Sequence, residues 1–295
     1  MPYEQADRLW PHFEPLWTDL RRVDPSLVLA GGYGLFLKQR WLATAQDVLI
    51  LIPMAKWQMM APRVTNDLDF VAELDLIASP GRQRQVDGIL ESHGFGVVER
   101  NARWQFCKEL AGGQQVKVDF HTPPPADERD DLRWDDRRVK PHPSLKSTGI
   151  HGRANPEAVG CGLHPFRFPV HGLQVVVPNP VTWAIMKMVA MRDCHERSHD
   201  VNETQGRTEY WRGQATKHAR DLCRILAMTC RDESDCARTV VAEMSRRGHF
   251  EGACTIAHGF FGATDGWGCQ AARPEWRPED LGTIRETLCH WFAPR

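Results

Sequence analysis

The segment Asp67-Leu68-Asp69-Phe70 constrains the fold of this chain most, because polar and apolar residues alternate along it. Such alternation is typical of a β-strand, whose side chains point to opposite faces in turn. We therefore expect Asp67 and Asp69 to share one face while Leu68 and Phe70 lie in a hydrophobic core. Two carboxylates on one face repel each other, and a divalent cation such as Mg²⁺ removes that repulsion. The alternative is a solvated strand with two surface aspartates, which the alternation alone allows equally.

A second segment, Gln115 to His121, alternates in the same way. The pattern places Lys117, Asp119 and His121 on one face and apolar side chains on the other. Asp119 is therefore a third candidate carboxylate on a neighbouring strand. An ion pair with the adjacent Lys117 is a simple alternative explanation for it, and the sequence leaves both open.

A glycine pair, Gly31-Gly32, stands between a predicted strand at residues 26–30 and a predicted helix at residues 33–41. A strand, two glycines and a helix bring backbone N–H groups close to a phosphate at the helix N-terminus. Most glycine pairs are merely turns, so this motif gains weight only from its neighbours.

The remaining pattern indicates an α/β (α+β) fold, a mixed sheet with flanking helices followed by a helical C-terminal region. We expect one α/β domain over residues 1–178 and a mainly helical domain over residues 179–295. Residues 122–156 are rich in Pro, Asp and Arg and are expected to form a loop, as are residues 195–213. Asn179-Pro180 is the predicted start of a helix, with the asparagine as its N-cap.

Composition excludes several classes of protein. The 295 residues carry a net charge of −1, so no overall basic field indicates a nucleic-acid partner. The nine cysteines are scattered without a C-x-x-C pair, which disfavours a disulfide framework or a zinc ribbon. The sequence shows neither a secretory signal nor a bilayer-spanning apolar run. We therefore expect a cytoplasmic protein with no membrane partner.

Five segments resemble, in order, those of the DNA polymerase β-like nucleotidyltransferase superfamily, and within it the AbiEii/AbiGii-type toxin nucleotidyltransferases. The resemblance spans roughly residues 27–227. The segments are Leu29-Ala30-Gly31-Gly32-Tyr33-Gly34-Leu35, Arg63-Val64-Thr65-Asn66-Asp67-Leu68-Asp69-Phe70, Val116-Lys117-Val118-Asp119-Phe120, Lys187-x-x-Ala190-x-Arg192 and Lys217-His218-Ala219-Arg220-Asp221-Leu222.

The resemblance implies a role for each matching residue. Asp67 and Asp69 would ligate two Mg²⁺ ions and Asp119 would complete the site, while Gly31 and Gly32 would lie under the triphosphate of an NTP. The other matching positions would bind nucleotide: Arg63, Thr65, Lys187, Lys217 and Asp221.

Two of these assignments have simpler alternatives. Lys187 stands in an apolar helix, so its ammonium group either snorkels to water or meets an anion. Lys217 and Asp221 are four residues apart on a predicted helix, where an ordinary salt bridge explains them.

The implied reaction is transfer of an NMP from an NTP to an acceptor, with RNA or tRNA as the acceptor and a cognate antitoxin protein as a further partner. One departure concerns Tyr33, which stands where the family usually has a small hydroxyl residue. The alternatives are a small-molecule nucleotidyltransferase of the antibiotic-modifying type and a non-catalytic nucleotide-binding descendant.

Overall fold

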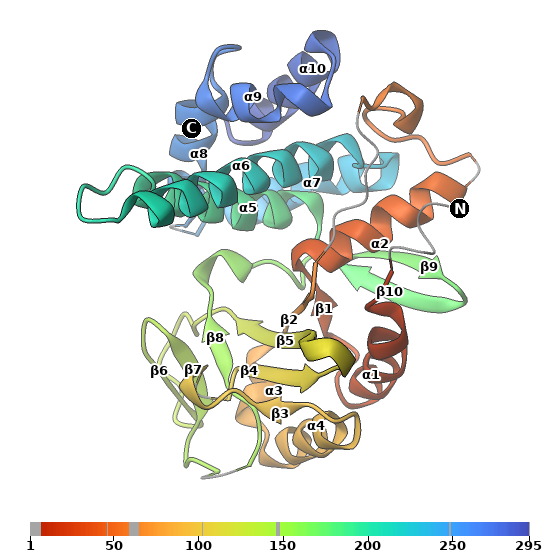
Figure 1. The fold of residues 1–295 in the computed structure, drawn as a ribbon, viewed down its shortest axis with the longest axis vertical. Coiled ribbons are helices and arrows are strands. Elements are labelled where there is room, and N and C mark those ends of the chain that lie inside the picture. The colour runs from red at the N-terminus through yellow and green to blue at the C-terminus, as the bar shows by residue number, and fades with distance from the viewer. Residues whose placement is uncertain are drawn as a thin grey trace. The chain divides into compact units, whose positions relative to one another are not determined.

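The computed structural model (Figure 1) describes residues 7–45, 47–58, 65–101, 103–145, 148–247 and 249–294. The chain divides into two compact units, one of Met1–Trp41 with Pro62–Pro178 and the other of Leu42–Ala61 with Asn179–Arg295. The predicted fold class is confirmed, because a mixed sheet with flanking helices is followed by a helical C-terminal region.

In the described part of the first unit, eight strands form one mixed sheet with the order β1-β2-β5-β8-β7-β6, and β4 joins β5 and β3. Their bounds are β1 Val28–Leu29, β2 Asp67–Val71, β3 Gly96–Val97, β4 Gln105–Glu109, β5 Gln115–Thr122, β6 Leu132–Trp134, β7 Arg138–Pro141 and β8 Gly152–Ala154. A separate hairpin consists of β9 Phe166–Val170 and β10 Leu173–Val177.

Strands β2 and β5 lie side by side in parallel at the centre of this sheet. Leu68, Phe70, Val118 and Phe120 are fully buried, so one face of both strands lies in the hydrophobic core. That burial fixes the register, because a shift by one residue would move all four apolar side chains to the other face.

Helices of the first unit are α1 Trp10–Val23, α2 Gly31–Thr44 up to Trp41, α3 Leu74–Ala78 and α4 Pro80–Ser92. Short 3₁₀ turns cover η2 Glu99–Asn101, η3 Ala111–Gly113 and η4 Pro156–Ala158. Helix α1 buries Phe13 and Trp17, whose rings stack, and Trp17 also stacks on Phe70 of β2. This aromatic packing joins the helix to the central strands.

The second unit is helical. Its elements are α5 Pro180–Arg197, α6 Gln205–Ala227, α7 Arg231–Met244, α8 His249–Phe261, α9 Trp267–Ala272 and α10 Pro278–Trp291, with the 3₁₀ turns η1 Met54–Lys56 and η5 Arg273–Glu275. The predicted N-cap of α5 is confirmed, because Asn179 Oδ1 accepts a hydrogen bond from the Thr182 N–H at 2.8 Å.

Three local expectations are wrong. Residues 122–156 contain β6, β7 and β8, whose few residues and charged side chains give too little alternation to be read as strands. Helix α6 begins at Gln205, so residues 205–213 are helical. Residues 42–61 belong with the second unit, because Trp57 packs edge-on against Trp276 and the Ile52 N–H donates to the Ala227 carbonyl.

The nine cysteines all lie within the described residues and are free thiols. None of the helices in the described part of the chain has the length and apolar character needed to cross a bilayer.

Candidate functional site

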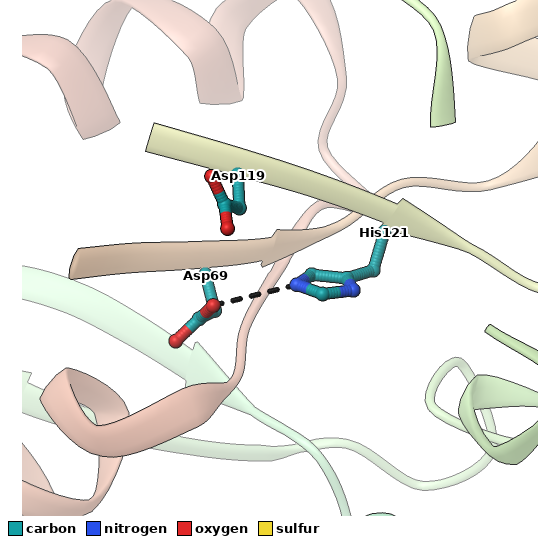
Figure 2. A group of neighbouring side chains, drawn as sticks. All are labelled: Asp69, Asp119 and His121. Atoms are coloured by element: carbon teal, nitrogen blue, oxygen red, sulfur yellow. Dashed lines mark hydrogen bonds and ion pairs between the residues drawn. The ribbon is translucent and has the colours of Figure 1, made fainter. Parts of the chain in front are cut away.

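The central strands bring Asp69 and Asp119 directly opposite each other. Asp69 of β2 and Asp119 of β5 are register partners in the parallel ladder, and both point away from the buried face (Figure 2). Asp119 is only 9% exposed, and Asp69 is half-buried. Two carboxylates this close and this desolvated destabilise each other unless a proton or a cation lies between them.

A histidine completes the group. His121 is two residues beyond Asp119 on β5, and its Nε2 lies 3.3 Å from Asp69 Oδ1 (Figure 2). Among the described residues, Asp69, Asp119 and His121 offer ligand atoms that all lie within 4.8 Å of one another. The three side chains could therefore hold a metal ion. On its other side, His121 Nδ1 lies 3.5 Å from Asn155 Nδ2, the kind of outer contact that orients a ligating imidazole.

His121 is a site residue that the sequence-based assignment missed. The alternation of residues 115–121 already placed it on the face of Asp119, so that signal was present. What the sequence did not show was that β2 pairs with β5 in a register that puts Asp69 beside both residues.

The environment of Asp119 disfavours its charged form. Burial raises the pKa of Asp119 to about 6, and the nearby negative charges of Asp69 and Asp67 act in the same direction. Two contacts oppose this shift: Gln105 Nε2 donates a 2.7 Å hydrogen bond to Asp119 Oδ1, and His121 adds favourable electrostatics. A metal ion would relieve the same penalty that the raised pKa reports.

The raised pKa predicts a pH dependence for the metal-free protein. The folded state holds the Asp119 proton more tightly than the unfolded chain, whose carboxyl has an ordinary pKa near 3.8, so stability falls as the pH rises from about 4 to about 6. At about 1.4 kcal/mol for each pKa unit, we expect Asp119→Asn to raise the free energy of unfolding by about 3 kcal/mol at neutral pH. Near pH 4 the two proteins should be equally stable. Urea denaturation in chelator across this range checks it, and a variant less stable than the wild type at neutral pH would contradict it.

The glycine turn lies against this carboxylate cluster. Gly31 has φ +63° at the N-terminus of α2, and an added Cβ would stand 1.8 Å from Asp69 Oδ2. Gly32 follows it, buried in the first turn of the helix. A side-chain-free residue is therefore required beside Asp69, and the N-terminus of α2 lies beside the cluster.

We expect Gly31→Ala to displace the Asp69 carboxylate. The new methyl group would overlap Oδ2, and a left-handed φ is unfavourable for alanine, so the free energy of unfolding should fall by about 1–3 kcal/mol. Affinity for Mn²⁺, measured by isothermal titration, should fall with it. Gly88→Ala in α4 is the matched control, because its added Cβ would meet no other atom. Unchanged Mn²⁺ affinity in Gly31→Ala would show that the glycine does not shape the site.

Tyr33 does not face the cluster as a substitute for the family's small residue. Its side chain is buried among aromatic rings, stacked on Phe36 and edge-on to Phe13, and its hydroxyl donates to Asp7 Oδ1 at 2.9 Å. Burial raises the pKa of Tyr33, and the adjacent Asp7 charge raises it further. Asp7 is itself paired with Arg40 at 2.9 Å. Tyr33 is therefore a core residue of the first unit.

Three other predicted site residues lie on β2 or just before it in the sequence. Asp67 is the register partner of Lys117, is exposed, and lies on the same face as Asp69. Thr65 Oγ1 accepts a hydrogen bond from the Asp67 N–H at 3.2 Å, which places Thr65 at the start of β2. Arg63 lies outside the described residues.

The remaining predicted residues belong to the second unit. Lys187 of α5 donates to Asp221 Oδ2 of α6 at 3.0 Å, and both side chains are buried. The ammonium group of Lys187 thus meets an anion that the protein itself supplies. Lys217 Nζ donates to Gln214 Oε1 at 3.3 Å. Contact of these three residues with a nucleotide stays a prediction.

Comparisons with known proteins give little beyond this geometry. The chain matches no family model and no curated protein. Among solved structures it is similar to the CD-NTase CdnG of Bradyrhizobium diazoefficiens in complex with GTP, at 11% identity over 98% of this chain and 87% of that chain. The TM-score is 0.24, a value at which the likeness carries no argument. The resemblance to the AbiEii/AbiGii-type enzymes therefore stays a prediction.

Proposed function

We propose that this protein is a metal-dependent nucleotidyltransferase that moves an NMP from an NTP to an acceptor hydroxyl. The observation that carries the proposal is the in-register pair Asp69 and Asp119, set against Gly31 at the N-terminus of a 14-residue helix. Carboxylates that hold a divalent cation and helix N–H groups that bind phosphate are the two parts that a triphosphate requires.

The residues divide the chemistry between them. The acceptor oxygen attacks the α-phosphorus, the bond between that phosphorus and the bridging oxygen breaks, and pyrophosphate leaves. Asp119 accepts the proton of the acceptor hydroxyl, because its carboxylate lies beside Asp69 within the cluster. The N–H groups at Gly31 and Gly32 neutralise charge on the triphosphate, and Asp67 and Asp69 would hold the divalent cations that bind it. Bound divalent cations supply charge neutralisation for the attacking and leaving oxygens.

The donor set also bears on the metal. The prediction was a two-metal Mg²⁺ site built from Asp67, Asp69 and Asp119, and His121 adds an imidazole to it. Carboxylates suit Mg²⁺ and Mn²⁺ alike, whereas an imidazole is a better ligand for transition metals than for Mg²⁺. We therefore propose that the site accepts both ions and that His121 favours Mn²⁺.

The nucleotide contacts of Arg63, Thr65, Lys187, Lys217 and Asp221 are part of the same proposal, as are a toxin role with an RNA or tRNA acceptor and a cognate antitoxin. The departure at Tyr33 was the reason to consider a non-catalytic descendant, and its buried position removes that reason. The rival is a small-molecule acceptor, which the assay must distinguish from an RNA acceptor.

The test uses each NTP labelled in turn at the α- and γ-phosphate, with Mg²⁺ or Mn²⁺, total RNA and a small-molecule extract. We expect the α label to enter the acceptor and the γ label to appear in pyrophosphate. Label in RNA identifies the RNA branch, and label in the small-molecule fraction identifies the rival. Transfer of the γ label would make the protein a kinase, and release of free phosphate alone would make it a hydrolase.

A further inference from the structure

A pocket of about 640 Å³ lies in the first unit, and neither the resemblance nor the proposed function assigns it a role. Its lining is rich in arginine and includes one indole ring; among the lining residues are Arg100, Trp104, Asp135, Arg137, Arg138 and Arg153. Together with Asp136, the described lining therefore sets four guanidinium groups against two carboxylates. We call it the arginine pocket. Its volume is that of an ordinary small-ligand site.

Strand register places the arginine pocket next to Asp69, Asp119 and His121. Arg153 of β8 is the register partner of His121, and Arg138 of β7 is the register partner of Arg153. Register partners project from the same face of a sheet. The face that carries Asp69, Asp119 and His121 therefore continues directly onto Arg153 and Arg138.

Hydrogen bonds join the pocket wall to the same residues. Asn101, which lines the pocket, donates to Gln105 Oε1, and Gln105 in turn donates to Asp119 Oδ1 at 2.7 Å. On the other side, Asn155 follows β8 and contacts the His121 imidazole. A chain of hydrogen bonds through Asn101 and Gln105 thus links the pocket wall to Asp119.

Contacts within the pocket hold two of its arginines in place. The Arg153 guanidinium lies 5.3 Å from the ring centroid of Trp104, a cation–π contact that orients its donors. Asp135 Oδ1 accepts hydrogen bonds from the backbone N–H groups of Arg137 and Arg138, at 2.9 Å each. This carboxylate therefore stabilises the turn between β6 and β7. The Arg138 side chain lies 3.8 Å from Asp135, too far for a close bidentate pair.

We propose that the arginine pocket binds a phosphate group of the acceptor, so that the acceptor is a nucleotide, either free or at the end of a strand. The inference rests on the proposed function for the identity of the neighbouring site. In the sheet order, Gly31 follows β1 on one side of β2 and β5, while β8 and β7 lie on the other. The NTP and the acceptor would then approach the carboxylates from opposite sides, which suits an attacking oxygen in line with the leaving pyrophosphate.

Guanidinium groups favour phosphate over the other acceptor chemistries. Their planar donors match two phosphate oxygens at once, and they repel a polycationic acceptor such as an aminoglycoside. The arginine pocket therefore separates the proposed nucleotide acceptor from the antibiotic-modifying rival.

The test measures binding without metal or NTP, so that it does not depend on catalysis. The probes are a 5′-fluorescein single-stranded RNA of about 12 nucleotides, followed by anisotropy, and AMP as an unlabelled competitor. We expect Arg138→Ala and Arg153→Ala each to raise the Kd for the RNA about tenfold. Each should also reduce the salt dependence of log Kd by a slope of about 0.7. The Kd of Arg153→Lys should lie between those of the wild type and Arg153→Ala, because lysine keeps the positive charge but lacks the planar, bidentate guanidinium group.

Arg22→Ala is the matched control, since it removes one exposed arginine of the same unit that pairs only with a surface aspartate in the contacts described. Competition by AMP would show that a single nucleotide phosphate fills the pocket, and binding of RNA without such competition would show that a strand is needed. The proposal is wrong if the two pocket variants bind the RNA as Arg22→Ala does, or if the wild type binds neither probe. Probe binding without NMP transfer would overturn the proposed function while leaving the pocket in place.

Discussion

Asp69→Asn is expected to reduce NMP transfer by at least about a thousandfold, because it removes the carboxylate that faces both Asp119 and His121. The protein should remain folded, since the substitution keeps the size of the side chain and removes one of two opposed negative charges. Transfer of α-labelled NMP measures the first effect, and urea denaturation measures the second.

Asp75→Asn provides the control for that result. Asp75 belongs to the same unit, its side chain is 77% exposed, and it pairs with Arg129 at the surface. This variant should transfer NMP at the wild-type rate. If Asp69→Asn did so as well, Asp69 would have no part in the reaction.

Lys187→Met is expected to lower the free energy of unfolding by about 3–5 kcal/mol, because it leaves the buried Asp221 carboxylate without the ammonium group 3.0 Å away. The double variant Lys187→Met/Asp221→Leu should recover most of that loss, since two apolar side chains tolerate the same environment. Arg207→Ala removes an exposed guanidinium of α6 that pairs with Glu203, and should change stability by less than about 0.5 kcal/mol.

The same series separates a structural role of Lys187 from a nucleotide contact. If Lys187 binds the nucleotide, the double variant should be stable yet bind NTP more weakly than the wild type. Equilibrium dialysis with a labelled NTP measures this. Wild-type NTP affinity in the stable double variant would show that Lys187 does not contact the nucleotide.

The two central strands could be predicted because burial and alternation agree in them. Leu68, Phe70, Val118 and Phe120 are fully buried while their neighbours carry charge, so the period of two is complete in both segments. The helix start at Asn179 was predictable for a local reason as well, because its cap lies three residues from the N–H that it satisfies.

The sequence predicted Asp69 and Asp119 as candidate site residues but not His121, because pairing between distant strands leaves no local signal in the sequence. Asp69 and Asp119 are fifty residues apart, and only the parallel register of β2 and β5 sets them and His121 together. The arginine pocket depends on three short strands within residues 122–156, whose exposed charged residues gave the composition of a loop.

The membership of residues 42–61 depended on contacts that no local pattern encodes. Trp57 meets Trp276 more than two hundred residues later in the chain, at a ring distance of 4.9 Å. A sequence read in order assigns such a segment to the domain around it, whereas burial of a large aromatic surface decides where it packs.

Binding of Mn²⁺, followed by electron paramagnetic resonance, tests the metal site at Asp69, Asp119 and His121 most directly. We expect the wild type to bind Mn²⁺, Asp69→Asn and Asp119→Asn each to weaken binding by at least about tenfold, and His121→Ala to weaken Mn²⁺ more than Mg²⁺ in competition. Asp75→Asn should bind Mn²⁺ with the affinity of the wild type. Added NTP should tighten Mn²⁺ binding in both of these proteins. Equal Mn²⁺ affinity in Asp75→Asn and in the double variant Asp69→Asn/Asp119→Asn would contradict a metal site at these carboxylates.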